Sequence, residues 1–428
     1  MATKIALLQS NPIVGDINGN AVMIQNLANL AYESGAGFAV TTELAISGYP
    51  PRDLLLQDDF ISRCHQIASD LQSPIPILVG TPVPPIQDRS LPGNGVVRAG
   101  DSIREITRKQ LLPTYDVFDE ARYFEADERP GIARTIAGVD VGVTICEDAW
   151  QHCGATPNDY DSDPIAQIAE WGRQGVLLDA TVNLSASPYH ADKSGVRIEV
   201  ARSAASSLNH PFLLANQVGG NDDLLFDGRS IIAWPDGTAV VAPAWKEGVL
   251  VADLSDPSKC VWKGEGDLVH LSPNQEFNEG DNDLLDAVIT GLSDYCRKSG
   301  IKKIVLGLSG GIDSALAACV ASKAVGPDNV TGISMPSRHS SQHSIDDAKA
   351  TAETLGINFL MYPIAKLHET ADSELSNILE NGNPVAGENL QARLRGLIVM
   401  AHANANGAMA IATGNKSEYA VGYSTLYG

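Results

Sequence analysis

The sequence has no general surplus of positive charge. Its 30 lysines and arginines stand against 52 aspartates and glutamates, which gives a formal net charge of −22. A surface of this sign has no electrostatic reason to bind the phosphate backbone of a nucleic acid or an anionic membrane. We therefore expect neither partner. An anionic ligand would need a local device, such as a helix N-terminus, a few basic side chains or a metal ion.

Long hydrophobic runs and paired cysteines are also missing. The apolar run near the N-terminus covers only residues 5–8, which is too short for the core of a signal peptide or for a membrane span. The 6 cysteines are scattered without a CxxC pair, so they support neither a disulfide framework nor a zinc knuckle. We expect a cytoplasmic protein.

What the sequence does contain indicates two α/β domains. In residues 1–254, short β-rich runs alternate with helical stretches, which predicts a layered α/β domain, and Pro-Asp-Gly within residues 230–241 predicts a hairpin. Residues 255–280 are rich in Pro, Gly, Asn and acidic residues and predict an interdomain linker. Residues 281–428 follow a β-α-β-α-β order, which predicts an open parallel sheet with its ligand beyond the carboxyl ends of the strands.

Three side chains at predicted strand ends form a first candidate site: Glu43, Lys109 and Cys146. A thiolate nucleophile needs a proton acceptor, and the oxyanion that its attack creates needs a positive charge or N–H donors, so these three groups suffice without histidine. Each also has an ordinary structural explanation. A buried cysteine is often only a small apolar residue, a strand-end glutamate a solvated cap, and a lysine beside Arg108 a surface group.

The stretches LPTYDVFDEARYF after Lys109 and NLSASPYHADK after Cys146 make the first half resemble the nitrilase superfamily, and more narrowly its glutaminase branch attached to synthetases. The resemblance implies an α-β-β-α sandwich. It also implies that Glu43 is the general base, that Lys109 stabilises the oxyanion, and that Cys146 is the nucleophile that forms a glutamyl thioester.

By the same resemblance, Tyr115, Ser187 and Lys193 bind glutamine. Arg122 and Glu147 lie in the same motifs. Each fits a structural ion pair as well as a place beside the reacting groups, so neither is assigned to catalysis.

A second candidate site is the run Ser309–Ser314, which reads SGGIDS between a predicted strand and a predicted helix. Free backbone N–H groups, a helix N-terminus and two glycines allow close approach to a phosphate. No lysine follows the glycines, so the GxxxxGK[ST] mechanism is not supported. The two glycines by themselves are also compatible with a mere tightening of a β-to-α turn. The run resembles the SGGxDS pyrophosphate loop of the N-type ATP pyrophosphatases.

Together with MPSRHSS at 335–341, the polar stripe of residues 389 and 393 and TGNKSE at 413–418, this run makes the second half resemble the glutamine-dependent NAD synthetases. The resemblance implies a Rossmann-like parallel sheet of the N-type ATP pyrophosphatase kind. It implies ATP binding by Gly307, Leu308, Ser309, Gly310, Gly311, Ile312, Asp313, Ser314 and Thr413. It also implies deamido-NAD binding by Asn389, Arg393 and Glu418, and Mg²⁺ at Asp313 and Glu418, whose hard oxygens suit that ion.

The expected reaction joins the two sites. Glutamine hydrolysis at Cys146 supplies ammonia, ATP adenylates deamido-NAD, and the products are NAD, glutamate, AMP and pyrophosphate. Two alternatives remain at this point: a stand-alone amidase or glutaminase with an inactive nucleotide-binding domain, and a non-catalytic nucleotide-binding module. Since related proteins continue beyond the position of Gly428, we expect the synthetase domain to be incomplete and NAD synthesis to be weak beside glutaminase activity. We also expect a homo-oligomer.

Overall fold

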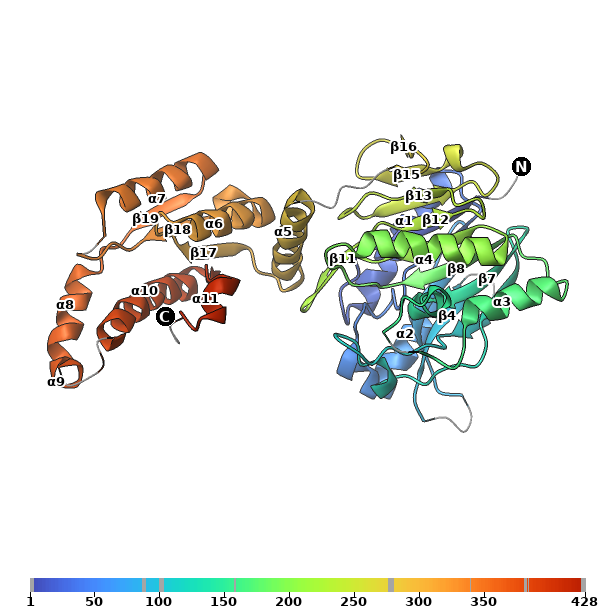
Figure 1. Ribbon diagram of the computed structural model, residues 1–428, viewed down its shortest axis with the longest axis horizontal. Helices are drawn as coiled ribbons and strands as arrows, with labels where there is room; N and C mark the ends of the chain where they lie inside the picture. The colour runs from blue at the N-terminus through green and yellow to red at the C-terminus, as the bar shows by residue number, and fades with distance from the viewer. Residues whose placement is uncertain are drawn as a thin grey trace. The chain divides into compact units, whose positions relative to one another are not determined.

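The computed structural model describes residues 4–86, 90–99, 104–157, 159–275, 281–338, 340–380, 383 and 385–424. The chain divides into two compact units, Met1–Ala287 and Val288–Gly428, which run from blue to yellow and from gold to red in Figure 1. Within the described residues, no helix is both long and apolar enough to cross a membrane.

The first unit is built on two sheets. In the described part of the chain, one sheet has the strand order β16-β15-β14-β1-β2-β3-β4-β5 and the other the order β13-β12-β9-β8-β7-β6. The bounds in the first sheet are β1 Ile5–Gln9, β2 Phe38–Val40, β3 Ile77–Val83, β4 Gly93–Ala99, β5 Arg104–Arg108, β14 Gly248–Ala252, β15 Val261–Gly264 and β16 Val269–His270. Those in the second are β6 Gly131–Ile136, β7 Val139–Ile145, β8 Ala180–Ser185, β9 Phe212–Asn216, β12 Ile231–Ala233 and β13 Ala239–Val241. A separate hairpin joins β10 (Val218–Asn221) to β11 (Leu224–Asp227).

The two sheets pack face to face with helices outside them. In β1, Ile5 and Leu7 point into the core between the sheets, whereas Leu8 belongs to the cluster under the helices α1 (Ile17–Glu33) and α2 (Asp58–Asp70). Helices α3 (Pro164–Arg173) and α4 (Lys193–Leu208) cover the second sheet (Figure 1). Because both of their faces are covered, the strands β1, β2, β9 and β14 are buried at every position instead of alternating between buried and exposed residues. The predicted α-β-β-α sandwich is confirmed.

Two local predictions in this unit can be compared with the structure. Strands β12 and β13 pair antiparallel around the Pro-Asp-Gly turn, so the hairpin is confirmed. Residues 255–275, where the sequence predicts a linker, contain the short helix η5 (Pro257–Lys259) and the strands β15 and β16, which extend the first sheet beyond β14. Composition conceals these strands, because the three consecutive buried residues 260–262 lie among charged and glycine-rich neighbours.

The second unit contains a parallel sheet of order β19-β18-β17-β20, as predicted. The strands are β17 Lys303–Gly307, β18 Val330–Ser334, β19 Asn358–Met361 and β20 Ala408–Ile411. The helices are α5 Asp281–Lys298, which begins in the first unit, α6 Ile312–Val325, η6 Pro327–Asn329, α7 Gln342–Leu355, α8 Ala365–Glu374, α9 Ser376–Leu379, α10 Val385–Asn406 and α11 Lys416–Ala420. Helices α6 and α7 pack on one face and α10 on the other (Figure 1). The chain leaves β17 toward β18 on one side and returns in β20 on the other, which makes the end of β17 a switch point where ligands bind in open α/β sheets.

Candidate active sites

Cys146 lies in a tight turn directly after β7. It opens the short helix η3 (Cys146–Ala149), and its φ of 42° is unusual for a residue other than glycine. The residue is 5% exposed. Burial raises the pKa of the thiol, and the negative charge of Glu43 adds to this, while Lys109 opposes it. The resting thiol is therefore protonated and needs a base in order to attack.

Glu43 and Lys109 form a buried ion pair. The Lys109 Nζ lies 2.7 Å from Glu43 Oε1, and both side chains are fully buried. Glu43 also accepts hydrogen bonds from Asn94 Nδ2 at 2.7 Å and from the backbone N–H of Ala186 at 3.0 Å. A buried charge is tolerated when it is paired and hydrogen-bonded in this way. The sandwich thus holds the carboxylate and the ammonium group in fixed positions.

A second carboxylate, that of Glu120, completes the surroundings of Lys109. Lys109 Nζ is 2.8 Å from each of its oxygens, and the Tyr49 hydroxyl donates to Glu120 Oε1 at 2.9 Å. Burial lowers the pKa of Lys109, but the charges of Glu120 and Glu43 outweigh it, so the pKa is raised and the ammonium persists. For the carboxyl group of Glu120 burial acts in the other direction: it raises the pKa to about 7, although the charge of Lys109 opposes this. An ammonium fixed between two carboxylates can stabilise a developing oxyanion.

Sequence reasoning missed Glu120, although it lies in the quoted motif DVFDEARYF. It starts the short helix η2 (Glu120–Arg122), and the buried Tyr123 and Phe124 follow it. An acidic residue that is followed by apolar ones is a weak signal of burial. Arg122, by contrast, has a side chain that is 62% exposed and pairs with Asp119 at 3.7 Å, which favours its structural interpretation.

Glu147 follows the cysteine and is buried. Its Oε1 accepts hydrogen bonds from the Tyr115 hydroxyl at 2.8 Å and the Tyr160 hydroxyl at 3.2 Å. Burial raises the pKa of Glu147, and the hydrogen bond from Tyr115 opposes this. Tyr160, which the sequence did not single out, and the predicted Tyr115 therefore converge on one carboxylate beside Cys146.

Ser187 lies in the loop between β8 and α4, and Lys193 lies at the end of that loop. Lys193 is the first residue of α4, and its Nζ lies 5.4 Å from the ring centroid of Trp150. Burial and the charge of Arg197 lower its pKa, while the charges of Cys146 and other acidic neighbours act in the other direction. Ser187 is buried, and its backbone N–H donates to Asn216 Oδ1 at 2.9 Å.

Asp148 connects the strand ends that carry the lysine and the cysteine. Its Oδ1 accepts from the backbone N–H groups of Gln110 at 3.1 Å and Leu111 at 2.9 Å, and its Oδ2 accepts from that of Ile145 at 2.9 Å. The side chain is buried. One carboxylate therefore fixes the segment after Lys109 against the turn that presents Cys146.

The second unit has a cavity of about 1370 Å³ at the carboxyl ends of β17, β18 and β20. Six of the predicted ligand-binding residues line it: Gly307, Leu308, Ser309, Arg393, Thr413 and Glu418. Gly310, Gly311, Ile312, Asp313 and Ser314 continue the loop beyond Ser309 and are not among the lining residues that the structure describes. Asn389 lies one turn before Arg393 on α10 and is not among the lining residues in the described part of the chain.

The SGGIDS loop has a specific local structure. Gly310 has a φ of 84°, and a Cβ at this position would lie 2.2 Å from the carbonyl oxygen of Ser344, so only glycine fits. The hydroxyl of Ser314 lies 3.2 Å from the backbone nitrogen of Ser309 and 3.1 Å from its hydroxyl. Helix α6 begins at Ile312 with Gly311 as its N-cap. The loop thus brings a helix N-terminus to the cavity edge, where an anion is favoured.

The two predicted metal ligands share one neighbour, Asn415. Its Nδ2 donates to Asp313 Oδ1 at 3.2 Å, and its backbone N–H donates to Glu418 Oε2 at 3.1 Å. Across the residues that the structure describes, no group of three or more His, Cys, Asp or Glu side chains is arranged to hold a metal ion. A cation at this position would need further oxygens from a ligand.

Comparisons with known proteins agree with this division. The carbon-nitrogen hydrolase family matches residues 4–258, and the NAD synthase family matches residues 284–428. The chain is 41% identical over 438 residues to the glutamine-dependent NAD(+) synthetase of Synechocystis sp., covering 99% of this chain and 76% of that protein. It is 34% identical to the enzyme of the same name from Thermotoga maritima, again covering 99% of this chain and 76% of that protein.

A solved structure agrees over the whole chain. The glutamine-dependent NAD+ synthetase from Acinetobacter baumannii, in complex with ADP, superposes with a TM-score of 0.87 at 31% identity. The match covers 100% of this chain and 77% of that one. These matches show that the chain belongs to the family of glutamine-dependent NAD(+) synthetases.

Proposed function

We propose that the chain uses the ammonia of glutamine to convert deamido-NAD to NAD at the expense of ATP, with Glu43, Lys109 and Cys146 as the glutaminase residues. The observation that carries this assignment is the buried ammonium of Lys109, 2.7 Å from Glu43, in the unit that also presents Cys146 on a turn with positive φ. The NAD synthase match over residues 284–428 supports synthesis, and it speaks against a stand-alone amidase with an inert second domain.

In the first half-reaction, Glu43 accepts the thiol proton as Cys146 Sγ attacks the amide carbon of glutamine. The oxyanion that forms lies beside the ammonium of Lys109. When it collapses, the C–N bond breaks, Glu43 returns the proton, and ammonia leaves a glutamyl thioester. Glu43 then takes a proton from water, which attacks the thioester, so that glutamate leaves and the thiol is restored.

The head group of glutamine is a zwitterion and requires one group of each charge. Glu147, positioned by Tyr115 and Tyr160, accepts the α-ammonium. Lys193 lies within electrostatic reach of Cys146 and Glu147 and binds the α-carboxylate. Ser187 lies on the same loop as Lys193 and contacts the substrate from there.

In the second half-reaction, the phosphates of ATP bind at Ser309–Ser314, where the N-terminus of α6 and the local N–H groups favour an anion. The carboxylate of deamido-NAD attacks the α-phosphorus, which displaces pyrophosphate. Ammonia then attacks the adenylate, and AMP leaves. Arg393 on α10 and Thr413 line the same cavity and contact the nucleotides.

Asp313 and Glu418 fit Mg²⁺, because they supply carboxylate oxygens on either side of Asn415. Proteins usually bind this ion through one or two carboxylates, and phosphate oxygens and water fill its remaining positions. Bound there, Mg²⁺ would offset the charge of the phosphates.

The experiment is to incubate the protein with glutamine, ATP, Mg²⁺ and deamido-NAD and to quantify glutamate and NAD separately. Cys146→Ala should abolish glutamate release, because the thiol serves only the first half-reaction, while any NAD synthesis from added ammonium chloride should stay at the parent level. Cys153→Ala is the matched control, since Cys153 is an exposed free cysteine. Glutamate release by Cys146→Ala at the parent rate would show that the site is assigned wrongly.

A further inference from the structure

A buried aspartate at the start of α5 binds three groups of the first unit. Asp283 Oδ1 accepts from Arg229 Nη2 at 2.7 Å and from Trp245 Nε1 at 2.8 Å, and its Oδ2 accepts from the Tyr189 hydroxyl at 2.9 Å. Burial alone would raise the pKa of Asp283, but the hydrogen bonds from Arg229 and Trp245 outweigh it and lower the pKa. The carboxylate therefore stays charged at neutral pH.

One of these donors belongs to the loop that carries proposed glutamine-binding residues. Tyr189 lies between Ser187 and Lys193 in the connection from β8 to α4. Its ring packs edge-on against Trp245 with centroids 4.9 Å apart, and its backbone N–H bonds to the carbonyl oxygen of Leu225. The hydroxyl bond to Asp283 therefore ties the middle of this loop to the first turn of α5.

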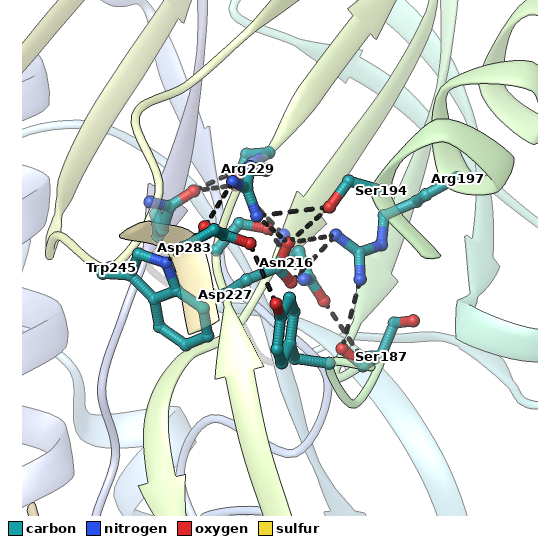
Figure 2. A network of polar contacts seen from close by, with 12 residues as sticks. Ser187, Ser194, Arg197, Asn216, Asp227, Arg229, Trp245 and Asp283 are labelled. Carbon is teal, nitrogen blue, oxygen red and sulfur yellow. Dashed lines mark hydrogen bonds and ion pairs between the residues drawn. The ribbon is translucent and has the colours of Figure 1, made fainter. Parts of the chain in front are cut away.

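A second route reaches the same loop through charged groups, as Figure 2 shows. Arg229 Nη1 donates to Asp227 Oδ2 at 2.9 Å and to Ser194 Oγ at 3.2 Å. Asp227 in turn accepts from Arg197 Nη1 at 3.0 Å, and Arg197 Nη2 donates to the carbonyl oxygen of Ser187 at 3.5 Å. A buried network of this kind depends on its charged members, since removing one of them leaves the charge of its partner uncompensated.

The backbone around this network is strained. Arg229 and Trp245 have φ values of 51° and 57°, and Asp192, which precedes Lys193, has a φ of 68°. Such conformations persist only where the surroundings fix them. The interactions of Asp283 are thus part of what keeps these turns in place.

We propose that Asp283 is a positioning residue for glutamine: by fixing Tyr189 and Arg229, it holds the loop so that Ser187 and Lys193 face the substrate. The inference rests on the proposed glutaminase function and adds a residue that lies between the two family-matched segments, 4–258 and 284–428. Asp283 acts through the loop, because its carboxylate binds Arg229, Trp245 and Tyr189, and none of these is one of the reacting groups Glu43, Lys109 and Cys146.

The test compares steady-state glutamate release by Asp283→Asn, Tyr189→Phe and Trp245→Phe. Asp283→Asn and Tyr189→Phe should each raise the KM for glutamine about tenfold with little change in kcat. Tyr189→Phe removes the hydrogen bond from the loop to the Asp283 carboxylate, and Asp283→Asn removes the negative charge that both Tyr189 and Arg229 bind. Trp245→Phe is the matched control. It removes a donor to Asp283 that is not on the loop and keeps a ring against Tyr189, so the KM should change less than about twofold.

A second measurement separates positioning from loss of structure. Cys146 is alkylated either with iodoacetamide, which has no head group for the loop to bind, or with the diazoketone analogue of glutamine. Asp283→Asn and Tyr189→Phe should slow labelling by the analogue about tenfold relative to the parent and leave labelling by iodoacetamide unchanged. The double variant should be no worse than Asp283→Asn alone, because both changes remove the same bond.

The outcomes distinguish the two proposals. If the analogue fails to label Cys146 in the parent, the glutaminase assignment is wrong. If it labels parent and both variants at equal rates, Asp283 does not position the loop. If kcat and iodoacetamide labelling fall together with thermal stability, Asp283 is only structural, and the inference is overturned.

Discussion

Lys109 shows how far the meaning of a residue depends on its surroundings. In the sequence it follows Arg108, which is typical of a surface position, yet both side chains are buried. Arg108 is paired with Glu105 at 2.7 Å, and Lys109 is paired with Glu43 and Glu120. The lysine was predicted from its motif and its chemistry. Glu120 was not, because nothing in a sequence indicates which of several nearby acids will share one buried cation.

Replacing Glu120 tests this arrangement at the residue scale. Glu120→Gln removes a negative charge beside Lys109 and weakens the hold on its Nζ. We expect kcat for glutamate release to fall by about a hundredfold with little change in KM, which is the order of loss seen when one group that stabilises an oxyanion is disturbed. Steady-state kinetics give both constants.

Arg122→Gln provides the control for Glu120→Gln, because Arg122 lies in the same short helix with an exposed side chain. It should retain the parent kcat. A kcat for Glu120→Gln as high as that of Arg122→Gln would remove Glu120 from the positioning of Lys109.

His210 has no proposed part in the reaction, but its protonation makes the stability of the fold depend on pH. Burial lowers its pKa to about 4, and its Nε2 lies 2.8 Å from Thr181 Oγ1. Since the unfolded chain takes up this proton near the ordinary pKa of about 6.5, the neutral ring stabilises the fold above that pH. This stabilisation is lost progressively as the pH falls from about 6.5 toward the lowered pKa.

We therefore expect His210→Asn to have a flatter dependence of the melting temperature on pH between about 6.5 and 4.5 than the parent. The measurement is thermal unfolding across that range. His270→Asn, at an exposed position on β16, should follow the parent curve. Parallel curves for His210→Asn and the parent would contradict the buried neutral state of His210.

At the scale of elements, the strand ends were predictable and the pairing of distant segments was not. Glu43 and Cys146 follow short apolar runs, and such runs indicate buried strands whose ends present side chains. The hairpin of β12 and β13 follows from its Pro-Asp-Gly turn. Strands β15 and β16 depend on a neighbour elsewhere in the chain, β14, to satisfy their backbone groups, so their local composition predicts a loop.

Asp148 offers a test at this scale, because it joins the segments after β5 and β7. In Asp148→Asn, an amide NH2 group replaces one carboxylate oxygen and faces a backbone N–H group, from which it cannot accept a hydrogen bond. We expect a loss of stability of about 1–3 kcal/mol and a lower kcat, since Lys109 and Cys146 are no longer fixed against each other. Denaturant unfolding and glutamate release measure the two effects, and an unchanged kcat in a destabilised variant would limit Asp148 to a structural role.

At the scale of the whole molecule, strong negative charge coexists with binding of anionic nucleotides. The net charge is −22, and the anion site that we propose is local: the SGGIDS loop, the start of α6, and Arg393 at the cavity wall. The sequence predicts a loop between a strand and a helix here, because the motif is contiguous, and the structure has β17 before it and α6 after it. The cavity itself requires β17, β18 and β20 to be adjacent.

The two sites lie in different units, so damage to one should leave the other intact. Gly310→Ala would place a methyl group 2.2 Å from the Ser344 carbonyl oxygen at a φ of 84°. We expect ATP affinity to fall by about tenfold or more, as measured by equilibrium binding, with no change in glutamate release. Gly311→Ala should cost much less, because its added Cβ meets only the Ser309 hydroxyl at 3.3 Å. Equal losses in the two variants would contradict the steric argument.

The position of Asp283 has a consequence for recombining modules of such enzymes. The residue belongs to the first unit by its contacts, yet it lies in α5, which continues into the second unit, and it falls outside both family-matched segments. A hybrid protein joined at residue 258 would supply Asp283 from a different parent, and one joined at residue 284 would change parents within α5, directly after Asp283. A junction that keeps Arg229, Trp245 and Tyr189 together with the carboxylate of Asp283 must lie beyond the first turn of α5. A transferable glutaminase module therefore extends further along the chain than its family match does.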